Sequence, residues 1–509
     1  MHGKYSFIRI IFLILIFNLP LSSSAGAEKM VLTLNDAIRI ALKESYTVKS
    51  FRQDVIQREG FYRSQKANFR PYANLNVQTP NFAERVQTVL QPSGLPIYES
   101  RGSMEYDISL DFNYKIPTDG TFTLRSSLNR IRNEIIFENN TEEDLKGWTN
   151  MRLSFTQPIF TDNTLKEDLK QAELNYQSSL KRFNRNERNI IYNVTTAFYN
   201  LYSASREVEI YKQRMDNSME AYNLAKLKYD AGIIPEVEAL QLEVKKAESE
   251  AEYINALNDL ETEKDSFKQL IGLPIKNDIQ VAADIEYKTF EINLEKAIEE
   301  GLKNRSEIVE NQIDVELSKI NVKETKRQRE FRGNIYFYYD FTGVSTTDSR
   351  HLSDLFNSSF TDFQNRPPNR GVTLNFSYPI LDWGRNSARV DAMVASLREN
   401  ELDLENQIVT IKREIREVVR NVKESENRLR ILKAGQEVAE KSYNISKERF
   451  DNGDITSQDL ALDQSELTRS QLSYLSAFVA YQRNVADLKR KTMWDFERNE
   501  SYLKDSYIN

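Results

Sequence analysis

Side chains that commonly carry out chemistry are scarce in this sequence. The 509 residues include no cysteine and two histidines, His2 and His351. A cysteine nucleophile is therefore excluded, and no motif around the histidines supports a typical zinc site or a catalytic triad. Carboxylates are abundant, but charged helix surfaces supply them everywhere. We predict that the chain is not an enzyme, that it has no metal site and that it needs no cofactor.

The N-terminal segment has the pattern of a secretory signal peptide. Lys4 and Arg9 precede an apolar run, Ile10–Leu19. A stretch of small residues follows and ends in Ala-Gly-Ala at 25–27. The apolar run is too short for a transmembrane helix, which needs about 20 residues, and no later run is long enough. We expect cleavage after residue 27. The remaining 67 basic and 76 acidic residues give a negative balance that argues against nucleic acid as a partner.

An internal duplication spans most of the chain. The sequences "FTQPIF" and "FSYPIL" surround Pro158 and Pro379, which are 221 positions apart. The same offset aligns the segments that follow, including Tyr-Asp-Ala-Gly at 229–232 with Phe-Asp-Asn-Gly at 450–453. Because the register is kept at both the proline and the glycine, we interpret the chain as two repeats, residues 28–283 and 284–509.

Each repeat is predicted to open with a helix and to continue with strands. The opening helices are Leu34–Ala67 and Leu294–Arg327. Alternating apolar and polar residues then predict strands at 72–79, 105–116, 121–130 and 150–157 in the first repeat, and at 334–342 and 371–378 in the second. The loop at 343–370 is polar. The first repeat has 39 additional residues before its proline, which we interpret as one extra hairpin or an elaborated loop.

A long helix follows the strands of each repeat, at 160–230 and 385–451. Ile411, Ile415, Val418 and Val422 form a heptad-like stripe, which is typical of a narrow helix–helix seam. About 65 residues at about 1.5 Å each give a rod on the order of 100 Å. Glycine ends each long helix, and return helices follow at 237–271 and 458–492. An opening and a return helix together match one long helix, so each repeat is predicted to build a two-stranded rod.

A strand that is joined through proline to such a rod fits a chain that passes from a membrane into an aqueous compartment. The alternation of the strands fits a barrel wall with lipid on one side and water on the other, and such a wall must be closed. Pro158 and Pro379 mark the strand-to-helix junctions, and Tyr378 and Trp383 fit an aromatic belt there. An ordinary half-buried sheet is the alternative for each strand alone. A cytoskeletal or tethering coiled coil is the alternative for the rod.

The order of these segments resembles the TolC family of outer-membrane efflux proteins over essentially the whole mature length. The motifs that carry the resemblance are "LTLNDAIRIAL", "FTQPIF", "FSYPILDWG", "YDAGIIPEVEALQLEV" and "FDNGDITSQDLALDQSEL". The resemblance implies an α+β membrane protein. It would be a homotrimer with a β-barrel in outer-membrane lipid, continued by a long α-helical coiled-coil tunnel in the periplasm. It also implies four strands per chain, twelve in the trimer, so we expect the extra hairpin, Glu105–Arg130, to form an extension of the barrel or an ordered loop.

The same resemblance implies a passive channel for efflux or for type I secretion. An inner-membrane transporter supplies the energy, and a periplasmic adaptor (membrane fusion protein) connects it to the channel. A periplasmic adaptor or a coiled-coil envelope scaffold is the alternative function, because adaptors also contain long helical hairpins. Adaptors usually carry compact β domains rich in glycine and valine, which this sequence lacks.

Candidate site residues follow from matching the family motifs to this sequence. The tips that dock the adaptor correspond to Gly232, Ile233, Gly453 and Asp454. Acids that narrow the periplasmic entrance and favour cations correspond to Glu238, Asp459 and Asp463. The sequence departs from the family pattern at Leu462, where a second acid is often found, and at Ile455, where a basic residue can occur. Ordinary solvated helix surface is the alternative interpretation of the three acids.

Overall fold

The computed structural model describes residues 30–502 apart from positions 91, 93, 95, 138, 139, 162, 283–288 and 346–350. The proposed signal peptide at 1–27 lies outside the described residues. The chain divides into two compact units. Unit 1 contains the chain up to Ser45, Ile191–Thr289 and Ser425–Arg483, and unit 2 contains Tyr46–Ile190, Phe290–Glu424 and the chain from Asn484.

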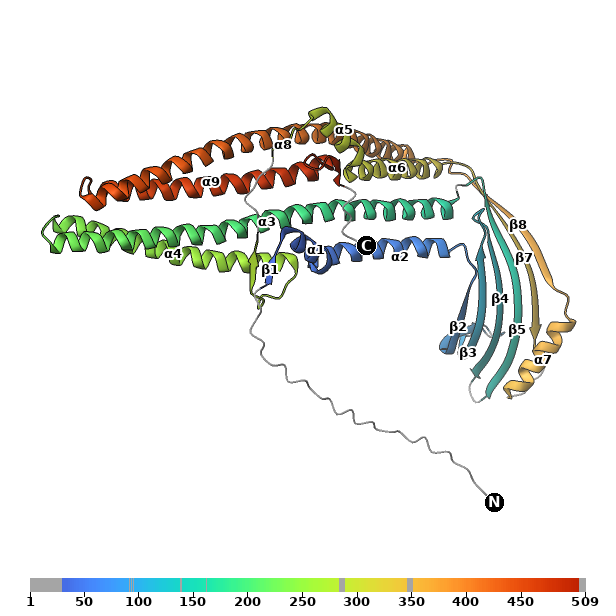
Figure 1. The fold of residues 1–509 in the computed structure, drawn as a ribbon. Helices are drawn as coiled ribbons and strands as arrows, with labels where there is room; N and C mark the ends of the chain where they lie inside the picture. The colour runs from blue at the N-terminus through green and yellow to red at the C-terminus, as the bar shows by residue number, and fades with distance from the viewer. Residues whose placement is uncertain are drawn as a thin grey trace, which may run out of the picture. The chain divides into compact units, whose positions relative to one another are not determined.

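Unit 1 is built around two helical hairpins (Figure 1). The C-terminal part of α3 (Thr164–Asp230) turns into α4 (Glu236–Ile271), and the C-terminal part of α8 (Arg385–Asn452) turns into α9 (Ser457–Thr492). The short helix α1 (Leu34–Glu44) packs on α4. Two short strands, β1 (Met30–Leu32) and β6 (Ile279–Val281), form a parallel pair. None of the described helices contains an apolar stretch that could cross a membrane.

The two opening helices are each interrupted at one residue. Ser45 separates α1 from α2 (Tyr46–Ala67), and Arg305 separates α5 (Leu294–Asn304) from α6 (Ser306–Arg327). Both residues have ψ angles near +130° and are therefore outside the helical region. At Arg305 the interruption coincides with a nearly buried guanidinium that binds Glu307 and Glu414, each at 2.6 Å. The continuous helices expected at 34–67 and 294–327 miss these two breaks.

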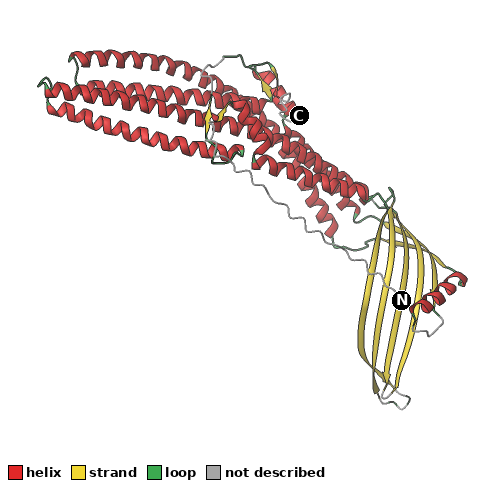
Figure 2. Ribbon diagram, turned by 60° about the horizontal axis from the view of Figure 1, so that its bottom comes forward, coloured by secondary structure: helices red, strands yellow, loops and turns green. Residues whose placement is uncertain are grey.

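Unit 2 contains one antiparallel sheet of six strands in the order β2-β3-β4-β5-β7-β8 (Figure 2). Their bounds are β2 (Tyr72–Leu90), β3 (Pro96–Lys115), β4 (Thr121–Phe137), β5 (Asn140–Ile159), β7 (Arg332–Val344) and β8 (Asn369–Ser377). The sheet of one chain therefore has two strands more than the four that we expect each chain to contribute to the barrel wall. The extra hairpin supplies β3 and β4, which lie inside the sheet, because their backbones pair with β2 on one side and with β5 on the other.

Several segments differ from the predicted bounds. β2 continues to Leu90, eleven residues beyond the predicted end, and β5 begins ten residues earlier than predicted. The added parts carry charged residues that hide the alternation, although their backbones still pair. The loop predicted at 343–370 contains α7 (Leu352–Asn365), which begins directly after His351 and packs on β5 and β7. After α9, β9 (Trp494–Asp495) and β10 (Glu500–Ser501) form a small antiparallel pair.

Candidate functional site: helical tips, junctions and sheet faces

The two hairpins of unit 1 turn with the same backbone geometry. Gly232 and Gly453 have φ angles of +73° and +85°, which side chains other than glycine rarely adopt. In each turn the glycine N–H and the next N–H donate to carbonyl groups in the last turn of the helix. The bonds are Gly232 to Tyr229 and Ile233 to Lys228, both 2.8 Å, and Gly453 to Phe450 at 3.0 Å and Asp454 to Arg449 at 2.8 Å. This pattern ends a helix and reverses the chain.

A hydrophobic core supports the two tips from beneath. Ile234 and Ile455 pack against it, and its buried members are Ala221, Ala225, Ala239, Leu242, Tyr443, Phe450, Leu460 and Leu467. Burial in this core raises the pKa of Tyr443 to about 12. Lys228 links the hairpins by donating to the carbonyl oxygen of Phe450. The predicted docking residues stay outside: Ile233 is 67% exposed and Asp454 is exposed. The tips therefore form an accessible surface on a supported base.

Asp459, one of the predicted entrance acids, closes the start of α9. Its carboxylate accepts hydrogen bonds from the N–H (3.1 Å) and the hydroxyl (2.8 Å) of Thr456, and its own N–H donates to that hydroxyl at 3.2 Å. This reciprocal arrangement is a capping box with aspartate as the acidic partner. The hydroxyl and N–H of Thr456 lower the pKa of Asp459. Asp459 is exposed and charged, and it also has a structural role.

The other two acids differ from each other. Asp463 is half-buried, and its carboxylate accepts a hydrogen bond from the hydroxyl of Ser446 on α8. Glu238 is half-buried in the first turn of α4, and its carboxylate has no hydrogen bond or ion pair with another described residue. Within the described residues, no group of histidine and acidic side chains is placed to hold a metal ion. Glu238 is therefore the acid with the least evident structural role.

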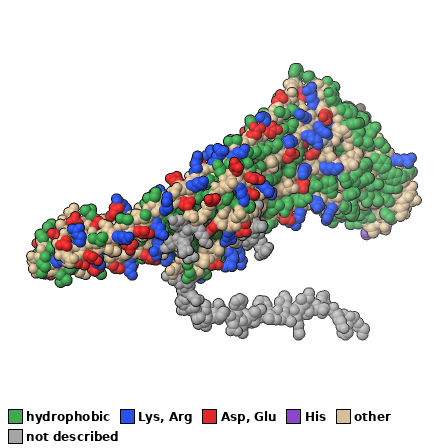
Figure 3. All heavy atoms as spheres, turned by 45° about the horizontal axis from the view of Figure 1, so that its top comes forward, with side chains coloured by type: hydrophobic (Ala, Val, Ile, Leu, Met, Phe, Trp, Pro, Cys, Tyr) green, Lys and Arg blue, Asp and Glu red, His purple; other side chains and the backbone are tan. Residues whose placement is uncertain are grey.

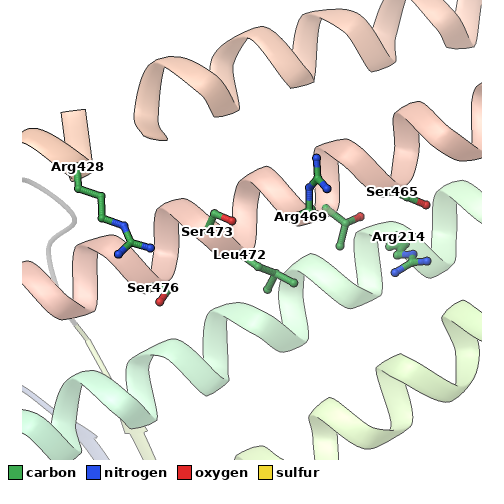
Figure 4. Close-up of a pocket in the computed structure, with 8 residues that line it drawn as sticks. Arg214, Arg428, Ser465, Arg469, Leu472, Ser473 and Ser476 are labelled. Carbon is green, nitrogen blue, oxygen red and sulfur yellow. The ribbon is translucent and has the colours of Figure 1, made fainter. Parts of the chain in front are cut away.

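A basic groove of about 370 Å³ lies along α9 in unit 1 (Figure 4). Arg214 of α3, Arg428 of α8 and Arg469 of α9 line it, together with small polar residues of α9. Arg214 pairs with Glu252 at 2.6 Å and Arg469 pairs with Glu466, whereas Arg428 has no such partner among the described residues. Sequence analysis missed this groove because its arginines come from three helices, and Arg214 of α3 is far in the chain from Arg428 and Arg469.

The strand-to-helix junctions contain the two predicted prolines. Pro158 is the penultimate residue of β5, opposite Asn334 of β7 and past the end of the pairing with β4. Pro379 follows the end of β8 by two residues. Each long helix begins six residues after its proline. Asn163 caps α3 by accepting from the Lys166 N–H at 2.9 Å.

Asp382 has the corresponding capping role before α8. Its carboxylate accepts from the N–H groups of Asn386 (3.2 Å) and Gly384 (3.1 Å), and these bonds lower its pKa. The side chains around it are open to the surroundings: Trp383 is 90% exposed, and Tyr378 and Ile380 are also exposed. Exposed aromatic and aliphatic side chains next to a strand end fit the predicted belt at a membrane boundary.

One face of the six-stranded sheet is apolar and exposed. Its large exposed side chains include Leu75, Val77, Ile108, Leu110, Phe112, Tyr114, Phe122, Leu128, Met151, Leu153, Phe337, Val372, Leu374 and Phe376. Hydrophobic side chains gather over the sheet in Figure 3, whereas charged and polar side chains are mixed on the helices. A soluble protein rarely leaves such a large apolar face uncovered, but a lipid-facing wall requires one.

The opposite face of the sheet is polar. Asp340 of β7 accepts from Asn150 at 2.6 Å and pairs with Arg152 at 3.2 Å, both on β5. A second cavity of about 350 Å³ opens here, lined by Arg125, Ser127, Asn129, Trp148, Asn150, Arg152 and Thr342. The sheet thus separates an apolar from a water-compatible side.

Helix α7 covers part of the apolar face at the ends of β5 and β7. The hydroxyls of Ser359 and Thr149 are 2.7 Å apart, and the Asp362 carboxylate accepts from the Val344 N–H at 2.8 Å. Gly343 makes this approach possible, because an added Cβ would lie 1.9 Å from the Ser359 carbonyl oxygen. On the other side of the helix, Phe360 is 51% exposed.

Known proteins are similar to this chain in sequence pattern and in fold. A family model described as "Outer membrane efflux protein" matches residues 121–273 and 340–492, one match in each repeat. The CmeC outer membrane channel of Campylobacter jejuni is 16% identical, with a TM-score of 0.68 over 93% of this chain and 88% of that chain. A search of curated proteins finds no significant match.

Two further solved structures are similar. The outer membrane protein VceC of Vibrio cholerae is 14% identical, with a TM-score of 0.64 over 90% of this chain and 95% of that chain. The MtrE outer membrane channel of Neisseria gonorrhoeae, in its open state, is 14% identical, with a TM-score of 0.63 over 90% and 88% of the two chains. At these identities the structural likeness shows the fold.

Proposed function

The chain belongs to the outer membrane efflux protein family, and from this premise we propose that it is the exit duct of a three-part transport system. It is an outer-membrane efflux channel that extends into the periplasm. We propose that three copies assemble, that a periplasmic adaptor docks at the tips, and that an inner-membrane transporter supplies the energy. The channel then conducts passively, in drug or metal efflux or in type I secretion.

One observation carries this proposal: a sheet with an apolar and a polar face is joined directly to long, paired helices. The apolar face fits lipid, and the polar face fits a water-filled lumen. The alternative functions, a periplasmic adaptor or an envelope scaffold, do not require an exposed apolar sheet. The tips suit docking because Ile233 and Asp454 are accessible while the residues below them are packed.

We further propose that the three acids act at the periplasmic entrance. Glu238 fits this role best, because its carboxylate has no other described partner. Asp459 and Asp463 also cap or brace α9, so their charge would serve the entrance in addition to the fold. Negative charges that the symmetry of the trimer brings together attract cations and repel anions.

A cross-linking experiment in intact cells tests the docking proposal. Cysteine is introduced at Ile233 or Asp454, and since the chain contains no natural cysteine, any thiol-dependent product reports that position. We expect short thiol-to-amine cross-linkers to join both variants to a periplasmic protein whose sequence contains a long helical hairpin. Ile380→Cys is the matched control, because that residue is also exposed but lies at a strand-to-helix junction. Products with the control alone, or none with the tip variants, would contradict docking at the tips.

A further inference from the structure

We propose that the free edges of β8 and β2 bind each other between neighbouring copies of the chain, and that three copies close a wall of eighteen strands. The proposal rests on the trimeric assembly proposed above. It identifies a second copy of this chain as the partner of each sheet edge. It also departs from the twelve-stranded wall that the family resemblance implied.

The first step is that all six strands face the same lipid. Directly opposed residues of β3, β4, β5, β7 and β8 form one apolar row across the sheet: Tyr114, Phe122, Phe155, Phe337 and Val372. A second row includes β2: Ala73, Phe112, Leu124, Leu153 and Tyr339. The extra hairpin therefore contributes to both rows. A hairpin outside the wall would not need apolar side chains in phase with the wall strands.

The polar face is equally continuous. Asn76 of β2 donates to Asp111 of β3 at 2.8 Å, and Thr123 of β4 donates to Asn113 of β3 at 2.9 Å. Together with the bonds of Asp340 between β5 and β7, these contacts link neighbouring strands across most of the polar face. β3 and β4 thus face both lipid and lumen in the same way as the strands that flank them.

The second step concerns the two edges. Among the described strands, β2 pairs only with β3, and β8 pairs only with β7. An open edge leaves backbone N–H and C=O groups unpaired, which hydrocarbon does not tolerate. The six strands of one chain are fewer than the eight of the smallest single-chain barrels. Another copy must therefore cover each edge.

The edge of β8 matches the first part of the β2 edge in direction and approximately in length. β8 has nine residues, close to the 9–11 that span a membrane. On β2, regular pairing with β3 runs from Tyr72 to Gln78, where a bulge interrupts it, and Pro80 then has no N–H to offer a neighbour. β2 begins, and β8 ends, beside the helices, so the two edges meet antiparallel. The seven residues in the regular part of β2 can therefore pair with most of the nine residues of β8.

An eighteen-stranded wall is much wider than a twelve-stranded one. With strands about 4.8 Å apart and tilted by about 40°, the backbone diameter is about 36 Å rather than about 24 Å. The cross-section of the exit compartment is then about twofold larger by the same geometry. The proposal therefore concerns the outer end of the duct, whereas the docking and entrance proposals concern the tips.

Electron cryomicroscopy of the purified full-length protein in lipid nanodiscs tests the wall directly. We expect three copies and eighteen strands in a closed ring, with β3 and β4 between β2 and β5. A trimer with a twelve-stranded ring and the 96–137 hairpin outside it would overturn the inference and leave the proposed channel function intact. A ring closed by β2 and β8 of one chain would overturn it as well. A copy number other than three would instead reject the proposed assembly.

Engineered disulfides test the contact without imaging. Leu75→Cys is combined in turn with Val372→Cys, Leu374→Cys or Phe376→Cys, all on the apolar face. We expect at least one pair to give covalent dimers and trimers on non-reducing gels. Leu124→Cys with Leu374→Cys is the control, because Leu124 lies on the same face of a central strand, and it should remain monomeric. Equal cross-linking in the control, or none in all three pairs, would overturn the edge contact.

Deleting the hairpin tests the width. Replacing residues 91–139 by an Asn-Gly turn removes β3 and β4 and joins the end of β2 to the start of β5, which lie at the same end of the sheet. The variant should have four strands per chain. Polyethylene glycols of graded size are added on the barrel side during conductance recordings. We expect the largest polymer that enters the wild-type lumen to have about 1.5-fold the radius of the largest that enters the deletion variant. Identical cut-offs in two conducting trimers would contradict the inference.

Discussion

At the residue scale, the backbone conformation of the two tip turns favours glycine. Gly232 and Gly453 have positive φ angles, but an added Cβ would meet no atom within 4 Å. Substitution by alanine should therefore cost conformational energy only, about 1 kcal/mol at each site. We expect Gly232→Ala and Gly453→Ala each to lower the thermal unfolding midpoint in detergent.

The control for this prediction is a glycine in the same helix. Gly435 lies inside α8, also with open space around its Cβ position, and its φ is not positive. Alanine should stabilise the helix there by about 1 kcal/mol. Opposite signs at Gly453 and Gly435 would support the account of the turn. A loss of stability of similar size at both sites would contradict the conclusion that the positive φ causes the loss at Gly453.

Arg305 holds a second local feature together, the break between α5 and α6. Its guanidinium binds Glu307 and Glu414, and removing one partner of a buried ion pair typically costs about 3 kcal/mol. Arg305→Leu should reduce the free energy of unfolding by about that amount. Adding Glu307→Gln and Glu414→Gln to this variant should restore part of the loss, because no buried charge then remains unpaired. If the free energy of unfolding does not recover, lost packing of the Arg305 side chain, rather than an unpaired charge, causes the destabilisation.

The same cluster makes stability depend on pH. Burial opposes ionisation of Glu307, but the hydrogen bond and charge of Arg305 outweigh burial and lower the pKa of Glu307 from its usual value. A lowered folded-state pKa stabilises the fold above the unfolded pKa, and the contribution is lost as pH falls through the folded value. The difference in stability between wild type and Arg305→Leu should therefore shrink below about pH 4. A constant difference in chemical denaturation from pH 7 to pH 3 would contradict this assignment.

At the element scale, α7 shows how one glycine allows a helix to lie on the sheet. Gly343→Ala would place a methyl group against the backbone of Ser359, and backbone cannot move aside as a flexible side chain can. We expect α7 to detach, and trypsin to cut more quickly near Arg366 when added to intact cells. Gly102→Ala on β3 is the control, since its nearest contacts are at 3.8 Å or more. Unchanged cleavage in both variants would contradict the packing of α7.

The elements also show what could be read from the sequence. The tip turns depend on local residues, so the sequence predicts the helix ends at Gly232 and Gly453 in both repeats. The alternation of Ile108, Leu110 and Phe112 predicted a strand, but not its neighbours, because pairing joins residues far apart in the chain. The break at Arg305 was hidden for the same reason: its partner Glu414 lies 109 residues away. Local alternation predicts β3 and β4 as strands, but only their pairing with β2 and β5 places them inside one six-stranded sheet.

At the scale of the whole molecule, the proposed entrance charge links the tips to conduction. If three copies of Glu238 surround the axis, Glu238→Gln should shift the reversal potential in a potassium chloride gradient toward zero, which is the value for no selectivity. Glu250→Gln is the matched control, twelve residues further along α4. Asp459→Asn is informative beside it, because asparagine keeps an acceptor for the Thr456 cap while removing the charge. Equal shifts for Glu238→Gln and Glu250→Gln would contradict a local entrance effect.

The central claim is that this chain forms a conducting pore through the outer membrane, and single-channel recording tests it most directly. The purified full-length protein is reconstituted in planar bilayers, with oligomeric state measured in the same preparation. The account predicts discrete conductance steps from the trimer, a preference for potassium over chloride, and block by trivalent cations added on the tip side. Membrane-inserted trimers that carry no current, or protein that stays in the aqueous phase without inserting, would contradict the account.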